Sequence, residues 1–183
     1  MSKLQEPFVR NAIPADAGAI CAIYNDAIGE RGSTFETDPR EPEDFDERIG
    51  DERFPLLVAE AGGGVAGWAA TASYSPRPCY AGIAECSVYV KEEERGRGIG
   101  TELAEALALA AWGEGFHKLL GKLFTDNAAS IRLVERCGFQ AVGVHRRHGQ
   151  LDGDWRDVLL VERLREPGGA SSAAPIKWSV PPG

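Results

Sequence analysis

The sequence predicts a mixed α/β domain built around one β-sheet. Short runs rich in β-branched and aromatic residues, typical of strands, alternate with longer stretches whose apolar residues recur at helical spacing. The 183 residues, of which 43% are hydrophobic, suffice for one compact domain with a sizeable core. We therefore expect one domain over residues 1–165 and a flexible tail over 166–183, where Pro, Gly, Ala and Ser dominate.

The first third of the chain predicts one strand followed by two helices. Residues 8–12 suit a short strand. Pro14 suits the first turn of a helix, because its fixed φ is compatible with that position. The apolar pattern of this helix ends near residue 28, where glycines follow. Residues 42–49 predict a second helix, which is short and acidic.

A hairpin and a further strand come next. Residues 54–61 and 65–74 are apolar runs separated by consecutive glycines, a pattern typical of two strands joined by a turn. Prolines make the following connection irregular. Residues 83–90 contain the strongly β-prone sequence Ser-Val-Tyr-Val and predict another strand.

The second half of the chain predicts two helices and three strands. A glycine-rich loop over residues 95–100 leads into a long helix, and Gly138 lies where a left-handed cap ends a shorter one. In order, the expected elements are a helix that ends at residue 112, a strand over 119–125, a helix over 127–136 and strands over 139–145 and 155–164.

Charge and hydropathy exclude several classes of protein. The 20 basic and 28 acidic residues give a net charge of −8, so an extended basic face for nucleic acid is not expected. A local basic pocket for a small anion remains open. No apolar run reaches the length of a membrane-spanning helix, and the N-terminus lacks the pattern of a secretion signal. We therefore expect a cytoplasmic protein that binds neither nucleic acid nor membrane.

The cysteines and histidines predict neither a disulfide framework nor a metal site. The chain has four cysteines and three histidines, and no two cysteines form a CxxC pair. We expect reduced thiols, most of which fill the core, and we expect Cys137 to be buried rather than catalytic.

The most informative segment is the glycine-rich loop between a predicted strand and a predicted helix. It reads Arg95-Gly96-Arg97-Gly98-Ile99-Gly100-Thr101. Glycines let backbone approach a bulky ligand, and N–H groups then point outward at the positive end of a helix dipole. A pyrophosphate suits this site, and Arg95 and Arg97 add charge. The missing lysine excludes a P-loop NTPase, and the loop comes too late in the chain for a dinucleotide fold. A plain tight turn is the alternative.

Several motifs together resemble the GNAT superfamily of N-acetyltransferases over about residues 8–164. The loop resembles the acetyl-CoA pyrophosphate loop of that superfamily. Further motifs are similar to the branch that acetylates phosphinothricin, methionine sulfoximine and related glutamate analogues. They are Ala22-Ile23-Tyr24-Asn25, Ser33-Thr34-Phe35-Glu36-Thr37, Glu85 to Val90 and Asn127-Ala128-Ala129-Ser130. Residues 145–158 look most similar to the arsinothricin-resistance members.

The resemblance implies a fold and a way of binding acetyl-CoA. The fold is α+β, with a single mixed and mostly antiparallel central sheet flanked by about four helices. In this family the strand that precedes the loop splays, so that backbone groups of Val88, Tyr89 and Val90 bond the pantetheine arm and the thioester carbonyl. Asn127 resembles the asparagine that contacts the pantetheine amide, and Ser130 ranks below it. The alternative role of Asn127 is a helix N-cap.

The resemblance also implies roles in catalysis. Glu85 matches the glutamate that serves as general base, which acetyl transfer needs because the amino group of a free amino acid is mostly protonated at neutral pH. An exposed strand carboxylate is the alternative. Val134 stands where the family often has Tyr or His as general acid. Valine donates no proton, so the acid stays unassigned; a thiol with a pKa near 8.5 makes unassisted departure tolerable.

The expected acceptor pocket follows from the same resemblance. The family places it at positions that correspond to Phe35, Arg77, Tyr80, Cys86 and Ser87. Arg77 is our candidate for the α-carboxylate of an amino acid, and a solvated loop arginine is the alternative. Three roles suit the basic stretch over residues 145–148: binding of an anionic acceptor, contact across a dimer interface, or exposure to solvent. Trp155 suits a place in the core, at an interface or as a lid over the pocket.

The sequence thus predicts an acetyl-CoA-dependent N-acetyltransferase that acts directly on the α-amine of a small amino-acid-like acceptor. A toxic glutamate analogue is the expected acceptor, and the resemblance implies a homodimer. A ping-pong route through Cys86 would require an activated thiolate. The alternatives are a peptide or protein N-acetyltransferase of the same fold and a non-catalytic acyl-CoA sensor.

Overall fold

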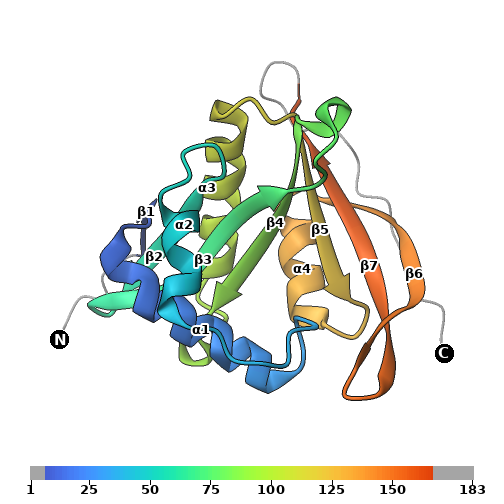
Figure 1. Cartoon of the computed structure of the whole chain (residues 1–183), viewed down its shortest axis with the longest axis horizontal. Coiled ribbons are helices and arrows are strands. Elements are labelled where there is room, and N and C mark those ends of the chain that lie inside the picture. The colour runs from blue at the N-terminus through green and yellow to red at the C-terminus, as the bar shows by residue number, and fades with distance from the viewer. Residues whose placement is uncertain (1–6, 167–183) are drawn as a thin grey trace.

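The structure of the protein is a computed structural model that describes residues 7–166. Within this range, seven strands form one sheet and four α-helices pack around it (Figure 1). The strands are β1 (Phe8–Asn11), β2 (Leu56–Ala61), β3 (Gly64–Ser73), β4 (Ile83–Val90), β5 (Lys118–Phe124), β6 (Gln140–Leu151) and β7 (Asp154–Leu164). The helices are α1 (Ala17–Glu30), α2 (Asp46–Ile49), α3 (Ile99–Gly113) and α4 (Ala128–Arg136).

The sheet is mixed and mostly antiparallel, which confirms the predicted fold class. Its strand order is β1-β2-β3-β4-β5-β7-β6. Five of the six neighbouring pairs in the described part of the chain are antiparallel, and β4 with β5 is the parallel pair. Because parallel strands need a crossover, α3 lies between β4 and β5 in the sequence and covers the sheet.

The core lies on both faces of the sheet because strand side chains alternate in direction. Leu56 and Val58 of β2 pack with α1 on one face, whereas Leu57 and Ala59 pack with α3 on the other. The helix α4 joins α3 on this second face, where Ala84 of β4 is fully buried. The result is a three-layer arrangement with α1 and α2 opposite α3 and α4 (Figure 1).

The strands β4 and β5 diverge along their length. Their pairing covers only the first residues of β4 and ends where Glu85 lies opposite Leu120. Beyond this point β4 stays paired with β3 as far as Val90, and β5 stays paired with β7 as far as Phe124. A wedge therefore opens between the two central strands, as Figure 1 shows, and it positions the candidate site.

The structure corrects several predicted boundaries. The strand predicted over 139–145 extends to Leu151, because a bulge between His145 and Gly149 lets it continue with polar residues. The helix predicted from Pro14 begins as a 3-10 turn (Pro14–Asp16) before α1. The helix predicted over 42–49 divides into a 3-10 turn (Pro42–Phe45) and α2.

Two further sequence-based expectations concern the ends of the chain and the membrane. The flexible tail predicted over residues 166–183 lies, except for Glu166, outside the described residues. Among helices of the described range, none combines the length and apolar character that crossing a membrane requires.

Candidate active site

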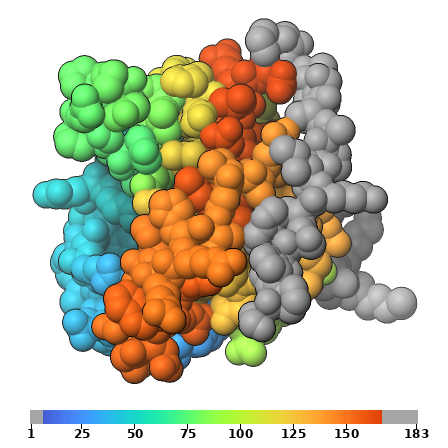
Figure 2. Space-filling model, turned by 90° about the vertical axis from the view of Figure 1, so that its right-hand side faces the viewer, coloured from blue at the N-terminus to red at the C-terminus, as the bar shows by residue number. Residues whose placement is uncertain are grey.

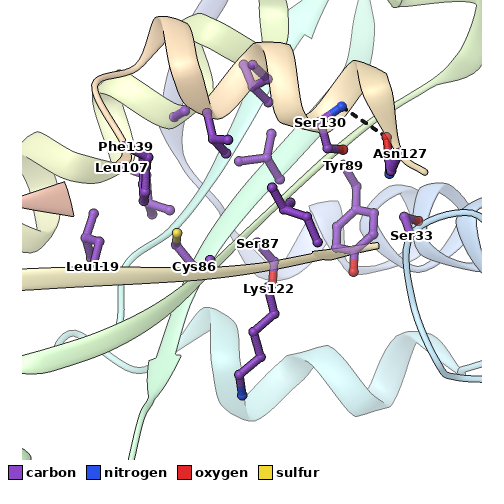
Figure 3. Close-up of a pocket in the computed structure, with 16 residues that line it drawn as sticks. Ser33, Cys86, Ser87, Tyr89, Leu107, Leu119, Lys122, Asn127, Ser130 and Phe139 are labelled. Carbon is purple, nitrogen blue, oxygen red and sulfur yellow. Dashed lines mark hydrogen bonds between the residues drawn. The ribbon is translucent and has the colours of Figure 1, made fainter. Parts of the chain in front are cut away.

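The wedge between β4 and β5 holds a cavity of about 80 Å³ (Figure 3). Its walls come from the diverging parts of the two strands, and α3 and α4 close it from one side. The lining is mostly apolar on the helical side, with Leu107, Leu133 and Phe139. A mostly apolar cavity with a few polar groups at its edge is typical of a small-molecule site.

A wider cavity of about 610 Å³ continues from the wedge to the glycine-rich loop. The two cavities share six lining residues, so they form one passage. The shared residues are Ser33, Val88, Tyr89, Asn127, Ser130 and Leu133. The wider part is lined by the end of α1, the loop before α3 and the first turns of α4. The passage thus runs from the surface at the loop to the middle of the sheet.

The glycine-rich loop has the backbone geometry of an anion site. Gly96 and Gly98 adopt φ angles of 77° and 89°, which side chains rarely tolerate. Gly98 is the N-cap of α3, whose unpaired N–H groups carry the positive end of the helix dipole. No heavy atom lies within 4 Å of a Cβ built at either glycine, so the backbone is open to a ligand. These features fit a pyrophosphate such as that of acetyl-CoA.

The two arginines of the loop are both paired with carboxylates of the protein. Arg95 donates to both carboxylate oxygens of Glu30, at 2.7 and 3.0 Å, and Arg97 pairs with Glu94. Arg95 lines the passage, whereas Arg97 does not. Both arginines are therefore held in ion pairs within the protein, and their contact with a pyrophosphate stays a prediction.

Three further arginines, which the sequence analysis did not predict as site residues, also line the passage. Arg132 and Arg136 lie one turn apart on α4, and Arg156 comes from β7. Arg132 and Arg136 are four residues apart on a strongly amphipathic helix. This i, i+4 spacing indicates that both cations lie on one face of the helix. Arg156 bonds both oxygens of Asp126 at 2.9 Å, so its charge is partly compensated.

Asn127 is the N-cap of α4, which confirms the structural alternative for this residue. Its side-chain oxygen accepts from the backbone N–H of Ser130 at 3.0 Å. Its amide nitrogen donates to the carbonyl of Gly32 at 3.0 Å, which ties α4 to the segment after α1. Both Asn127 and Ser130 line the two cavities, so their contact with a pantetheine arm stays a prediction.

Glu85 lies where β4 and β5 part, and it is paired with Lys122 of β5. The Lys122 Nζ to Glu85 Oε1 distance is 2.7 Å, and the two side chains are 47% and 31% exposed. By strand alternation Glu85 and Ser87 share the face of Tyr89, which packs against α1. Lys122 was not among the residues expected from the sequence, because it lies on another strand and carries no local motif.

Cys86 lies on the opposite face from Glu85. Figure 3 shows its sulfur on the side of α4 and the Lys122 amine on the other side of the strands. The thiol donates to the carbonyl of Leu120 at 3.3 Å, and burial raises its pKa to about 12. A thiolate is therefore disfavoured at neutral pH, which argues against a covalent route. Val134 lines the wedge, where it offers no proton.

The structure separates the residues expected to bind the acceptor. Phe35 packs edge-to-face on Phe124 with ring centroids 4.8 Å apart, at the wide end of the wedge. Arg77 and Tyr80 lie on the β3–β4 connection before the start of β4, with the guanidinium 5.7 Å from the Tyr80 ring centroid. Phe35, Arg77 and Tyr80 line neither cavity, whereas Cys86 and Ser87 line the wedge.

The β6–β7 hairpin closes against the segment that follows α1. Arg31 pairs with Asp152 at the hairpin tip, with 2.9 Å between nitrogen and oxygen. Figure 2 shows this tip beside the segment after α1. Gly149 allows close contact with Phe35, because a Cβ there would lie 2.8 Å from its ring. Phe35 is therefore held between this hairpin and β5.

The remaining aromatic and basic candidates lie on the surface of β6 and β7. Trp155 is 55% exposed, which excludes the core alternative for this residue. The ring centroids of His145 and His148 lie 4.7 Å apart at the bulge of β6. None of these three residues is among those that line the two cavities.

Comparisons with known proteins agree with this geometry. A model of the Acetyltransferase (GNAT) family matches residues 20–139. The L-methionine sulfoximine/L-methionine sulfone acetyltransferase of Pseudomonas aeruginosa is 35% identical over 87% of this chain and 95% of its own. A ribosomal-protein-alanine N-acetyltransferase from Brucella melitensis superposes with a TM-score of 0.82 at 33% identity, over 86% of this chain and 99% of that one. A phosphinothricin acetyltransferase from Sinorhizobium meliloti, solved with AcCoA, has a TM-score of 0.83 at 27% identity, over 93% and 94% of the two chains.

Proposed function

The chain belongs to the Acetyltransferase (GNAT) family, and from this premise we propose that it transfers an acetyl group from acetyl-CoA to the α-amine of a small amino-acid-like acceptor. One observation carries the proposal. The passage that begins at the glycine-rich loop ends in the wedge, which Ser87 and Lys122 line. Glu85 lines neither cavity itself, but its ion pair with Lys122 places a base next to the site of the electrophile.

Acetyl-CoA supplies a thioester whose acyl carbon accepts the amine. The loop residues Gly96 and Gly98, with the start of α3, would hold the pyrophosphate. Backbone groups of Val88 and Val90 are freed where β4 leaves β5, so they are available to bond the pantetheine arm and the carbonyl oxygen.

In the proposed reaction the chain supplies a base for the amine but no side-chain acid for the thiolate. Glu85 takes a proton from the acceptor ammonium, and the amine nitrogen then bonds the acyl carbon. The carbon–sulfur bond breaks, and the second proton that the nitrogen loses passes to the departing thiolate or to solvent. The sulfur leaves as a thiolate without a side-chain donor at position 134, which its ordinary pKa makes tolerable. The apolar wall with Leu107 and Phe139 limits water, which protects the thioester from hydrolysis.

The proposed acceptor is a toxic glutamate analogue such as phosphinothricin, methionine sulfoximine or arsinothricin. The names of the relatives support the first two, since one acts on methionine sulfoximine and another on phosphinothricin. We also propose a cytoplasmic homodimer. The exposed Val142 and Trp155 on β6 and β7, at the open edge of the sheet, favour an interface there, which sedimentation equilibrium would test.

A second candidate function is acetylation of a protein N-terminus, favoured by the likeness to the ribosomal-protein-alanine enzyme. The experiment that decides is release of free CoA from acetyl-CoA with phosphinothricin, L-methionine sulfoximine, arsinothricin and a panel of short peptides. Turnover with an amino acid alone is the expected result. Turnover with peptides alone would replace our proposal by the second function. Binding of acetyl-CoA without any turnover would favour a sensor.

A further inference from the structure

The ion pair between Lys122 and Glu85 offers two opposite charges at the wide side of the wedge. The charges lie 2.7 Å apart and both side chains are partly exposed, so an acceptor can reach them. Lys122 lines the wedge cavity itself. Lys118 lies four residues earlier, on the same face of β5, and pairs in the same way with Glu162, but it lies outside both cavities.

We propose that Lys122 binds the α-carboxylate of the acceptor and thereby selects free α-amino acids over other amines. This inference rests on the proposed function, and it goes beyond it by assigning a specificity residue.

The physical argument is one of complementary charges. A free α-amino acid carries an ammonium and a carboxylate separated by one carbon, and the protein presents a carboxylate and an ammonium side by side. When the acceptor binds, its ammonium takes the place of Lys122 beside Glu85, and its carboxylate takes the place of Glu85 beside Lys122. One ion pair within the protein becomes two between protein and acceptor, so no charge is left without a partner.

This exchange also places the proton to be removed. The acceptor ammonium lies against Glu85 only if the acceptor carboxylate holds Lys122 aside, so recognition and deprotonation are linked. An amine without a neighbouring carboxylate leaves Lys122 paired with Glu85 and meets a positive charge. The structure therefore predicts weak binding of α-carboxamides and of peptide N-termini, in which the carboxylate has become an amide.

The test compares L-methionine sulfone with its α-carboxamide, because the α-carboxylate is then the one anionic group that differs. Binding of each to the protein saturated with CoA is measured by calorimetry, and acetylation is measured in parallel. The variants are Lys122→Gln, Lys122→Arg and the matched control Lys118→Gln, which breaks an equivalent ion pair outside the cavities.

We expect wild type and Lys118→Gln to bind the free acid at least about tenfold more tightly than the carboxamide. Lys122→Gln should abolish this difference, chiefly by weakening the free acid, and Lys122→Arg should restore part of it. An unchanged preference in Lys122→Gln would overturn the proposal, and so would wild-type protein that binds both compounds equally or neither. Binding that follows our expectation without acetylation would leave Lys122 as the carboxylate site and refute the proposed function alone.

Discussion

At the scale of single residues, the chemistry of the site depends on which face of β4 each side chain occupies. Glu85 and Cys86 are neighbours in sequence, yet strand alternation sends the carboxylate to the side of Lys122 and the thiol to the side of α4. The carboxylate is therefore accessible and paired, whereas burial raises the pKa of the thiol to about 12. This difference favours direct attack by the amine over an acyl-enzyme route.

The substitution Glu85→Gln tests the proposed base. We expect kcat to fall by about 10²- to 10⁴-fold, because the amide cannot accept the ammonium proton. The affinity for acetyl-CoA should stay near that of wild type, since Glu85 lies outside the loop cavity. Steady-state kinetics and calorimetric titration with acetyl-CoA measure the two effects.

The matched control is Glu162→Gln, because Glu162 also pairs with a lysine at 2.7 Å, but its partner Lys118 lines neither cavity, whereas Lys122 lines the wedge. It should leave kcat nearly unchanged. If Glu85→Gln keeps the wild-type rate at neutral pH, the base is a different group.

At the scale of elements, the junction of β4, the glycine-rich loop and α3 forms the proposed cofactor site. Its strand ends the pairing with β5, its loop adopts positive φ angles, and its helix begins with free N–H groups. Asn127 adds a second junction, because it caps α4 and bonds the carbonyl of Gly32. Both junctions place helix N-terminal residues, those of α3 and α4, along one passage.

The substitution Gly98→Asp tests this junction. Gly98 has φ of 89°, and a carboxylate there would meet the proposed pyrophosphate. We expect the Kd for acetyl-CoA to rise about tenfold or more, both from like-charge repulsion and from backbone strain.

Gly153→Asp is the control for strain, because Gly153 has the same φ of 89°, equally open surroundings and a place at the β6–β7 turn. Thermal unfolding should show similar destabilisation of both variants. Of the two, Gly98→Asp alone should lose affinity for acetyl-CoA. An unchanged Kd in Gly98→Asp contradicts the loop assignment.

At the scale of the whole molecule, a charged cluster fastens the first strand to the rest of the domain. Arg10 of β1 donates to both oxygens of Asp16 at 2.7 and 2.9 Å, and to Glu60 of β2 at 2.7 Å. Asp16 also accepts from the backbone N–H of Ile13 at 2.8 Å, and its side chain is 8% exposed. The bonds from Arg10 lower the pKa of Asp16 below its ordinary value of 3.8.

The direction of this pKa change predicts how stability depends on pH. A carboxyl group whose pKa is lowered by folding stabilises the native state above its unfolded pKa, and it loses this effect as pH falls through the native pKa. We expect Asp16→Asn to lower the free energy of unfolding by about 1–3 kcal/mol at neutral pH. The difference from wild type should shrink below about pH 4.

Urea unfolding at pH 7 and at acidic pH measures this difference. Glu60→Gln is the comparison, because its side chain is 44% exposed, and it should cost less. A difference between wild type and Asp16→Asn that grows on acidification would show that Asp16 acts otherwise.

The sequence alone determined the fold class, most elements and the place of the glycine-rich loop. These features are local, because hydrophobic periodicity, turn glycines and the β-prone run over residues 83–90 act between near neighbours. The observed β4 begins and ends at the predicted residues, and the predicted cap position of Asn127 is correct. The long β6 was missed because its second half is polar, and its pairing with β7 outweighs that composition.

Only the tertiary structure decided which side chains meet. Lys122 lies 37 residues from Glu85 along the chain, and their contact exists because parallel pairing sets β5 beside β4. Arg95 is held by Glu30, which lies 65 residues earlier in the chain, and Arg77 lines neither of the two cavities. Charge pairing of this kind depends on distances between segments remote in sequence, and no local pattern encodes those distances.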